Sequence, residues 1–259
     1  DARILFHALK GKDPKDAMSV GDDFYATPKI PEKLKIGIPR HLLEEGLDKD
    51  VRVCFDQTLA RLEKEGHTLV DISLPTSSYA LAVYYVIMPA EASTNLARYD
   101  GMRYGLARRG ATLLEDYVKT RTEGFGEEVK RRVLLGTFVL SAGYIDAYYR
   151  KADAARAVLT REYDKAFEDA DVIAFPTTPS PAFPIGGKSD PLSMYLEDIF
   201  TVTANLTGMP AISVPMGTVQ GGGKDLPGGQ TEGDQAKNEE QFADSEFKGK
   251  ERKKSGFNI

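Results

Sequence analysis

The sequence has few cysteines and histidines, the residues on which disulfides and zinc sites depend. Its 259 residues include one cysteine, Cys54, no tryptophan, and three well-separated histidines. A single cysteine excludes an internal disulfide and fits a reducing compartment, and the scattered histidines lack the spacing of a zinc site. No apolar run is long enough to cross a bilayer, and the start at Asp1 does not read as a signal peptide. We therefore expect a cytoplasmic protein without a metal centre or a membrane segment.

Charge and motif content exclude further classes. The formal net charge is -5, which argues against strong autonomous binding to nucleic acid. Neither G-x-x-x-x-G-K nor G-x-G-x-x-G occurs in a setting suited to phosphate binding. With 41% apolar and 28% charged residues, the composition is that of a globular protein with a sizeable core.

The spacing of apolar residues predicts an α/β fold. Residues 34–39, 67–73 and 171–175 are short apolar segments bounded by proline, glycine or acidic residues, which favours strands. Residues 48–66 form an amphipathic pattern ending in Gly66, which predicts a helix. A strand, helix and strand in succession indicate a parallel βαβ unit. Further helices are expected over residues 1–11, 79–98, 111–121, 123–140 and 143–169.

The stretch 190–217, DPLSMYLEDIFTVTANLTGMPAISVPMG, combines several signals. Asp190-Pro191 can begin a helix, because proline at the first helical position loses no needed hydrogen bond. Gly208 and Pro210 interrupt the chain, and the apolar run 211–216 then reads as a buried strand. Residues 218–259 contain almost no aliphatic side chains. This tail cannot bury enough apolar surface to fold, so it is predicted to be disordered.

A few polar residues in apolar surroundings are candidates for binding. Asp198 is either a helix-surface acid or the partner of a cationic group. Tyr84, beside Tyr85, either packs in the core or offers its hydroxyl to a ligand. The three successive cations 130–132 point about 100° apart on a helix, so at least one should face inward. The polar loop 98–104 is either a surface turn or the wall of a polar pocket.

Five blocks carry a resemblance to the amidase-signature family. They are KLKIGIPR at 33–40, AEASTNLARYDGMRYG at 90–105, GFGEEVKRRVLLGTFVLSAGYIDAYYRKA at 124–152, FPTTPSPAFPIG at 175–186, and the stretch 190–217. The resemblance implies a mixed sheet flanked by helices. It covers residues 1–217, which we interpret as the C-terminal half of an amidase-signature domain. Residues 218–259 depart from the family, and a frameshift or misassembled coding sequence is our hypothesis for them.

Within this family, the chain resembles the glutamine-hydrolysing subunits of tRNA-dependent amidotransferases. The resemblance implies that glutamine supplies ammonia for converting Glu-tRNA(Gln) to Gln-tRNA(Gln), with Asp-tRNA(Asn) as a further substrate left open. It implies a heterotrimer with the B and C subunits of the amidotransferase, and contact with tRNA through the B subunit. ATP and Mg are expected on the partner, and no cofactor is expected in this chain.

The resemblance also assigns site residues. Arg132 would pair with the α-carboxylate of glutamine, Asp198 would hold its α-ammonium group, and Tyr84 would contribute its hydroxyl. Arg131 and Tyr85 are the neighbouring alternatives. The family's Ser-Ser-Lys triad lies in a Gly/Ser-rich signature, and no such stretch occurs here. We therefore expect the sequence to begin after the catalytic half, to contain no catalytic residue, and to be inactive alone.

Two other functions are kept open. A stand-alone amidase of the same superfamily would act on small or fatty amides, and would have no reason to bury both Arg132 and Asp198. A non-catalytic binding or assembly module would not need the missing nucleophile. Cooperative unfolding of the isolated chain would favour the module.

Overall fold

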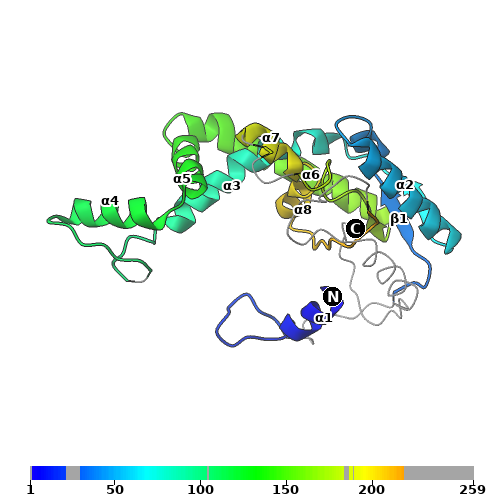
Figure 1. Ribbon diagram of the computed structural model, residues 1–259, viewed down its shortest axis with the longest axis horizontal. Helices are drawn as coiled ribbons and strands as arrows, with labels where there is room; N and C mark the ends of the chain where they lie inside the picture. The colour runs from blue at the N-terminus through cyan, green and yellow to red at the C-terminus, as the bar shows by residue number, and fades with distance from the viewer. Residues whose placement is uncertain (1, 22–29, 104, 184–186, 189, 219–259) are drawn as a thin grey trace. The chain divides into compact units, whose positions relative to one another are not determined.

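The computed structural model describes residues 2–21, 30–103, 105–183, 187–188 and 190–218 (Figure 1). The chain divides into two compact units. Unit 1 consists of Asp1–Pro75 with Glu162–Ile259, and unit 2 is Thr76–Arg161. Apart from Thr218, the predicted disordered tail lies outside the described residues.

A parallel sheet of three strands forms the centre of unit 1. β1 (Lys35–Ile38) lies between β2 (Thr68–Asp71) and β3 (Val172–Ile173), and both pairings are parallel. The β1 side chains Ile36 and Ile38 are 1% and 0% exposed. Burying each contributes about 1.5–3 kcal/mol. The predicted α/β class and all three of these predicted strands are confirmed.

α2 (Lys49–Lys64) connects β1 to β2, as a parallel pair requires. Its first turn is capped by Asp48, whose carboxylate accepts from the backbone N–H of Asp50 at 2.8 Å. Gly66 follows the helix with φ +93°, a left-handed conformation that glycine adopts without strain. Cys54 packs as a buried apolar residue, as predicted, and burial raises the pKa of its thiol despite the opposing charge of Arg61.

The other elements of unit 1 are short. They are α1 (Ala2–Leu9), η1 (Arg40–Leu43), α7 (Pro191–Tyr195), η4 (Leu196–Asp198) and α8 (Val202–Thr207). Asp190 caps α7, accepting from the backbone N–H of Ser193 at 2.9 Å. α8 ends at Gly208, with φ +72°. These two ends agree with the predicted helix start and break.

Unit 2 is helical in the residues described. η2 (Pro75–Tyr79) leads into α3 (Ala80–Leu96), and α4 (Leu113–Gly124), α5 (Glu127–Val139) and η3 (Ile145–Tyr149) follow. α6 (Arg150–Asp169) begins in unit 2 and ends in unit 1. The long helix predicted over 143–169 is observed without a break from residue 144, and its first part, η3, has π-helical geometry.

α3 and α5 lie side by side (Figure 1) and make the main helix–helix contact of unit 2. Their backbones approach closely at Gly136, where an added Cβ would lie 1.9 Å from the carbonyl oxygen of Pro89. No side chain larger than hydrogen fits there without moving a helix. Gly136 is therefore a packing residue of the α3–α5 pair.

The strand predicted over residues 211–216 is wrong. These residues have no strand pairing in the structure, and most of them are exposed. Pro210 and Pro215 lack backbone N–H donors, which shortens any ladder that the segment could form. The end of the segment is held by a side chain, because the Thr58 hydroxyl donates to the carbonyl of Met216 at 2.9 Å.

Among the described residues, no helix combines the length and apolar character required to cross a bilayer.

Candidate functional site

Arg132 lies on α5 and faces α3. Its Nε donates to Glu128 Oε1 at 2.7 Å, one helical turn earlier, and its Nη1 lies 3.4 Å from Met88 Sδ on α3. Its side chain is 30% exposed. The guanidinium is thus partly withdrawn from solvent, between a carboxylate on its own helix and an apolar residue on the neighbouring helix.

The electrostatic surroundings of Arg132 keep it charged. Burial lowers the pKa of the guanidinium, but the hydrogen bond and charge of Glu128, helped by Tyr85 and Tyr84, outweigh burial and raise that pKa above its ordinary value. Tyr84 and Tyr85 are half-buried on α3, and their rings meet edge to face at 5.3 Å. Unit 2 therefore brings Arg132 and Tyr84, two of the three predicted site residues, to the same pair of helices.

The two cations before Arg132 have other environments. Lys130 pairs with Glu127 at 3.3 Å, and Arg131 pairs with Glu128 on the same helix. The exposed fraction of the side chain is 34% for Lys130 and 50% for Arg131. Arg132 is less exposed than either and reaches α3 through its contact with Met88. Its choice as the ligand-binding arginine stays a prediction.

Asp198, the third predicted residue, belongs to unit 1 and ends the turn η4. It is half-buried. Its carbonyl accepts from the backbone N–H of Thr201 at 3.0 Å and from the Thr201 hydroxyl at 3.1 Å. These bonds fix the backbone on the C-terminal side of Asp198.

A polar cluster that the sequence did not predict surrounds the residue before Asp198. The Ser180 hydroxyl lies 2.9 Å and 2.8 Å from the two carboxylate oxygens of Glu197, and the ammonium of Lys188 pairs with Glu197 Oε1. The side chains of Glu197 and Lys188 are 12% and 22% exposed. The sequence drew attention to Glu197 only because it adjoins Asp198. Ser180 and Lys188 gave no signal, because they lie in a proline-rich loop without regular periodicity.

This cluster borders an open hollow of about 420 Å³ in unit 1. The loop at Gly46, Leu47 and Asp48 also lines it. The backbone N–H of Asp48 donates to the carbonyl of Pro179 at 2.8 Å, which ties this loop to the segment that leaves β3. Its lining residues follow β1 or β3 in the chain, and open α/β sheets bind ligands among the loops that follow their strands.

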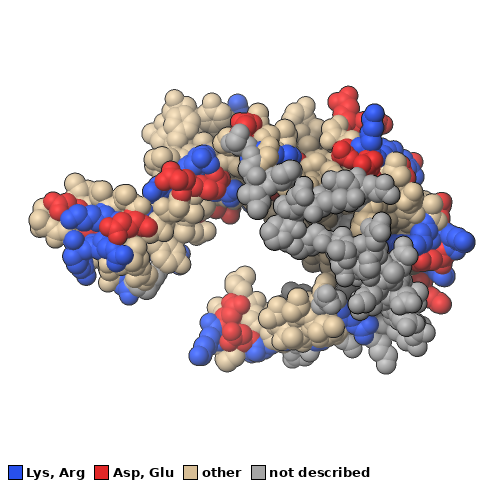
Figure 2. Space-filling model, viewed as in Figure 1, with Lys and Arg blue, Asp and Glu red and all other residues tan. Residues whose placement is uncertain are grey.

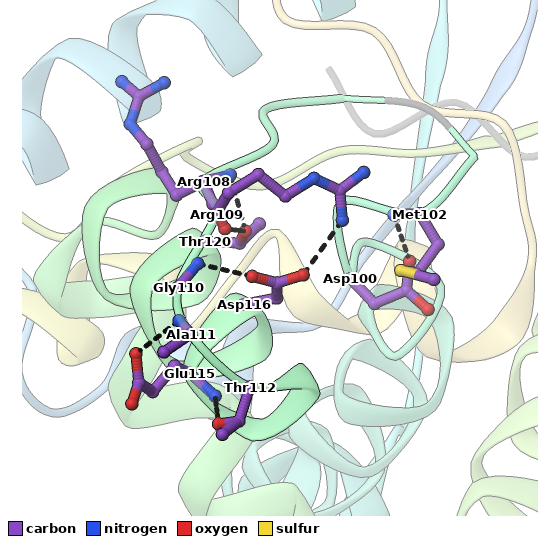
Figure 3. A network of polar contacts seen from close by, with 10 residues as sticks. All are labelled: Asp100, Met102, Arg108, Arg109, Gly110, Ala111, Thr112, Glu115, Asp116 and Thr120. Atoms are coloured by element: carbon purple, nitrogen blue, oxygen red, sulfur yellow. Dashed lines mark hydrogen bonds and ion pairs between the residues drawn. The ribbon is translucent and has the colours of Figure 1, made fainter.

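The segment 105–111, which precedes α4, folds onto that helix, as Figure 3 shows for residues 108–111. The carboxylate of Asp116 accepts from the backbone N–H of Gly110 at 2.5 Å and from Arg109 Nη1 at 2.9 Å. These two bonds hold the pKa of Asp116 below its ordinary value. The buried hydroxyl of Thr120 accepts from the backbone N–H of Arg108 at 3.0 Å. The loop is therefore held by specific bonds.

Acidic and basic side chains are intermixed over α4 and its loop (Figure 2). Arg121 donates to the carbonyls of Ala97 at 2.7 Å and of Tyr99 at 3.4 Å, which closes the start of the loop. These contacts favour the surface turn over the pocket wall for this segment. Across the described part of the chain, no three acidic, histidine or cysteine side chains are grouped as metal ligands.

Comparisons with a family model and with curated proteins agree on the family to which this chain is similar. The family described as Amidase matches residues 1–240, which extends past residue 217, where the resemblance seen in the sequence ends. The A subunit of glutamyl-tRNA(Gln) amidotransferase from Thermodesulfovibrio yellowstonii is 51% identical over 223 residues, covering 84% of this chain and 46% of the relative. The protein of the same name from Persephonella marina is 50% identical over 227 residues, covering 85% and 47%.

A solved structure agrees with these relatives. The crystal structure of the glutamyl-tRNA(Gln) amidotransferase A subunit from Thermotoga maritima is 35% identical, with a TM-score of 0.56, and the match covers 80% of this chain and 41% of that one. The predicted resemblance to the amidase-signature family is confirmed. The chain spans just under half the length of the curated relatives named here.

Proposed function

Because this chain belongs to the amidase family, we propose that it is the glutamine-recognition part of an amidotransferase subunit that acts on glutamyl-tRNA(Gln). The relatives that are 51% and 50% identical are named as A subunits of such an enzyme. Glutamine would lose its side-chain amide as ammonia, and a partner subunit would use ATP and Mg to transfer the ammonia to tRNA-bound glutamate. The B and C subunits would complete the complex, and tRNA would be reached through the B subunit.

The observation that carries this proposal is the partly buried guanidinium of Arg132 beside Tyr84 and Tyr85. Arginine offers five N–H donors, and the bonds to Glu128 and Met88 use two of them. The remaining donors can form a fork on a planar carboxylate, which a lysine cannot reproduce. An arginine withdrawn from solvent in this way suits the α-carboxylate of an amino acid better than an apolar amide.

The other end of glutamine needs an anion. We assign this role to Asp198, whose carboxylate would hold the α-ammonium group, and the hydroxyl of Tyr84 would add a hydrogen bond. The three residues bind and orient the substrate. The nucleophile and its base would come from a Gly/Ser-rich segment that this sequence lacks, so the described residues supply recognition alone.

A chimera tests this function. The part of this chain that matches the Thermodesulfovibrio yellowstonii relative would replace the corresponding segment of that relative. Ammonia release from glutamine would then be measured with that relative's own partners. We expect glutaminase activity, and we expect Arg132→Ala to raise the KM for glutamine far more than for an amide without the α-carboxylate. A folded chimera without activity, or equal effects on both amides, would contradict the proposal.

The chain alone gives a second readout. We expect it to bind glutamine without hydrolysing it, as measured by calorimetry with a parallel ammonia assay. Hydrolysis by the isolated chain would show that a nucleophile is present after all, and would favour a stand-alone amidase.

A further inference from the structure

The turn that carries Asp198 is held on both sides by residues of one segment, the chain that leaves β3. Phe175 begins this segment, and Ser180 lies five residues later. Glu197, just before Asp198, binds Ser180, and Phe200, two residues after Asp198, packs on Phe175. A half-buried carboxylate thus sits between a polar anchor and an apolar one.

The apolar anchor is a pair of buried rings. Phe175 and Phe200 are 3% and 5% exposed, and their ring centroids are 5.9 Å apart. Val202 and Leu206 continue this buried face into α8. The anchor fixes the C-terminal side of the turn to the core at the end of β3.

The polar anchor is built around the carboxylate of Glu197. Ser180 donates to it, Lys188 pairs with it, and it is only 12% exposed. Lys188 also lies over the ring of Phe183, with Nζ 4.7 Å from the centroid. Charge-assisted hydrogen bonds of this kind are short and directional, and they weaken when either charge is removed. The anchor therefore fixes the N-terminal side of the turn.

These two anchors restrict the direction of the Asp198 side chain. Successive side chains in a 3₁₀ turn point about 120° apart. Holding the Glu197 side chain in one direction therefore also fixes the direction in which the Asp198 side chain leaves its Cα atom. A charged group binds a ligand more tightly when it is already oriented, because less conformational entropy is lost on binding.

We propose that Glu197, held by Ser180 and Lys188, is a positioning residue that orients Asp198 toward the α-ammonium group of the substrate. The proposal rests on the function proposed above, in which Asp198 holds that group. Glu197 acts through the backbone of the turn and does not touch the substrate.

The test compares two ligands on the 259-residue chain. Glutamine carries the α-ammonium group, and 4-carbamoylbutanoate is the same molecule without it. For Glu197→Gln we expect the Kd for glutamine to rise about tenfold, since small misorientations of a binding group have large effects. The Kd for 4-carbamoylbutanoate should change less than about twofold, because it has no group for Asp198 to hold. Glu168→Gln, an exposed carboxylate on α6, is the charge-matched control and should change neither.

A second pair of variants guards against misfolding. Lys188→Met should weaken glutamine binding as Glu197→Gln does, and Lys188→Arg should restore it, because arginine keeps the ion pair. In Glu197→Gln, the backbone amide of Thr201 should exchange with solvent faster, since that amide donates to Asp198. Equal weakening of both ligands, or unchanged glutamine affinity with unchanged exchange at Thr201, would overturn the proposal.

The exchange measurement separates this proposal from the proposed function. If the wild-type chain binds neither ligand, the glutamine function fails for this chain. Faster exchange at Thr201 in Glu197→Gln would then still support the orienting role, and unchanged exchange would refute it.

Discussion

Arg132 and Glu128 form an ion pair across one turn of α5, with Nε 2.7 Å from Oε1. The pair is partly buried, so the guanidinium is held in one orientation before any ligand arrives. Glu128 also pairs with Arg131, so a single carboxylate is shared by two successive arginines. Arg132 is the less exposed of the two, and its guanidinium reaches α3 at Met88.

Arg132→Lys tests the role of the guanidinium. Lysine keeps the charge but loses the planar fork, so we expect glutamine to bind about tenfold or more weakly, as measured by calorimetry. Arg131→Lys is the matched control, because Arg131 is more exposed and pairs with the same Glu128. A larger effect from Arg131→Lys would show that the neighbouring residue is the ligand.

Tyr84→Phe tests the predicted hydroxyl contact. One hydrogen bond contributes about 0.5–1.5 kcal/mol, so the Kd for glutamine should rise roughly two- to tenfold. Tyr85→Phe keeps the edge-to-face ring pair and removes the adjacent hydroxyl, which makes it the control. Equal losses from both variants would contradict a hydroxyl contact specific to Tyr84, because each variant keeps its ring and loses only its hydroxyl.

Gly136→Ala should destabilise unit 2. The added Cβ would meet the Pro89 carbonyl, and overpacking of this kind costs about 1–3 kcal/mol even though alanine favours helix. Urea unfolding followed by circular dichroism measures the change. Gly126→Ala is the control, since no atom lies within 4 Å of its added Cβ. An equally stable Gly136→Ala variant would contradict the close approach of α3 and α5.

Asp116 predicts a pH dependence for the loop on α4. The N–H of Gly110 and the guanidinium of Arg109 lower its pKa in the folded chain. The unfolded chain, in which this carboxyl has a pKa of about 3.9, therefore binds the proton more readily than the folded chain does. The stabilisation is therefore fully present above about pH 5 and is lost as pH falls through the folded pKa.

Amide exchange at Gly110 between about pH 5 and about pH 2 measures this loss, after correction for the intrinsic exchange rate. In the wild type, protection of the Gly110 amide should decrease as the pH is lowered. In Asp116→Asn, that protection should be low and nearly constant over the same range. Asp164→Asn, an exposed carboxylate on α6, should behave like the wild type. Identical profiles for wild type and Asp116→Asn would contradict the role of Asp116.

Local signals in the sequence were sufficient to predict most elements. Asp48 and Asp190 cap helices because a short carboxylate can accept from the first turn, and Gly66 and Gly208 end them with positive φ. These effects act within a few residues, so they can be read without knowing the fold. The strand predicted at 211–216 failed because pairing depends on a neighbouring strand, which a local pattern does not specify.

The candidate site was only partly predictable for the same reason. Helical periodicity shows that residues 130–132 diverge, but the contact of Arg132 with Met88 depends on how α5 meets α3. The cluster at Glu197 depends on Ser180 and Lys188, which an irregular loop brings to it. Such loops have no period from which side-chain direction can be inferred.

Gly136 lies one helical turn after Arg132, on the same side of α5. The position where the backbones of α3 and α5 touch therefore also fixes the rotation of α5 about its own axis. That rotation selects which of three successive cations is turned toward Met88 and the tyrosines. A residue with no side chain thus determines the identity of the arginine that a ligand would meet.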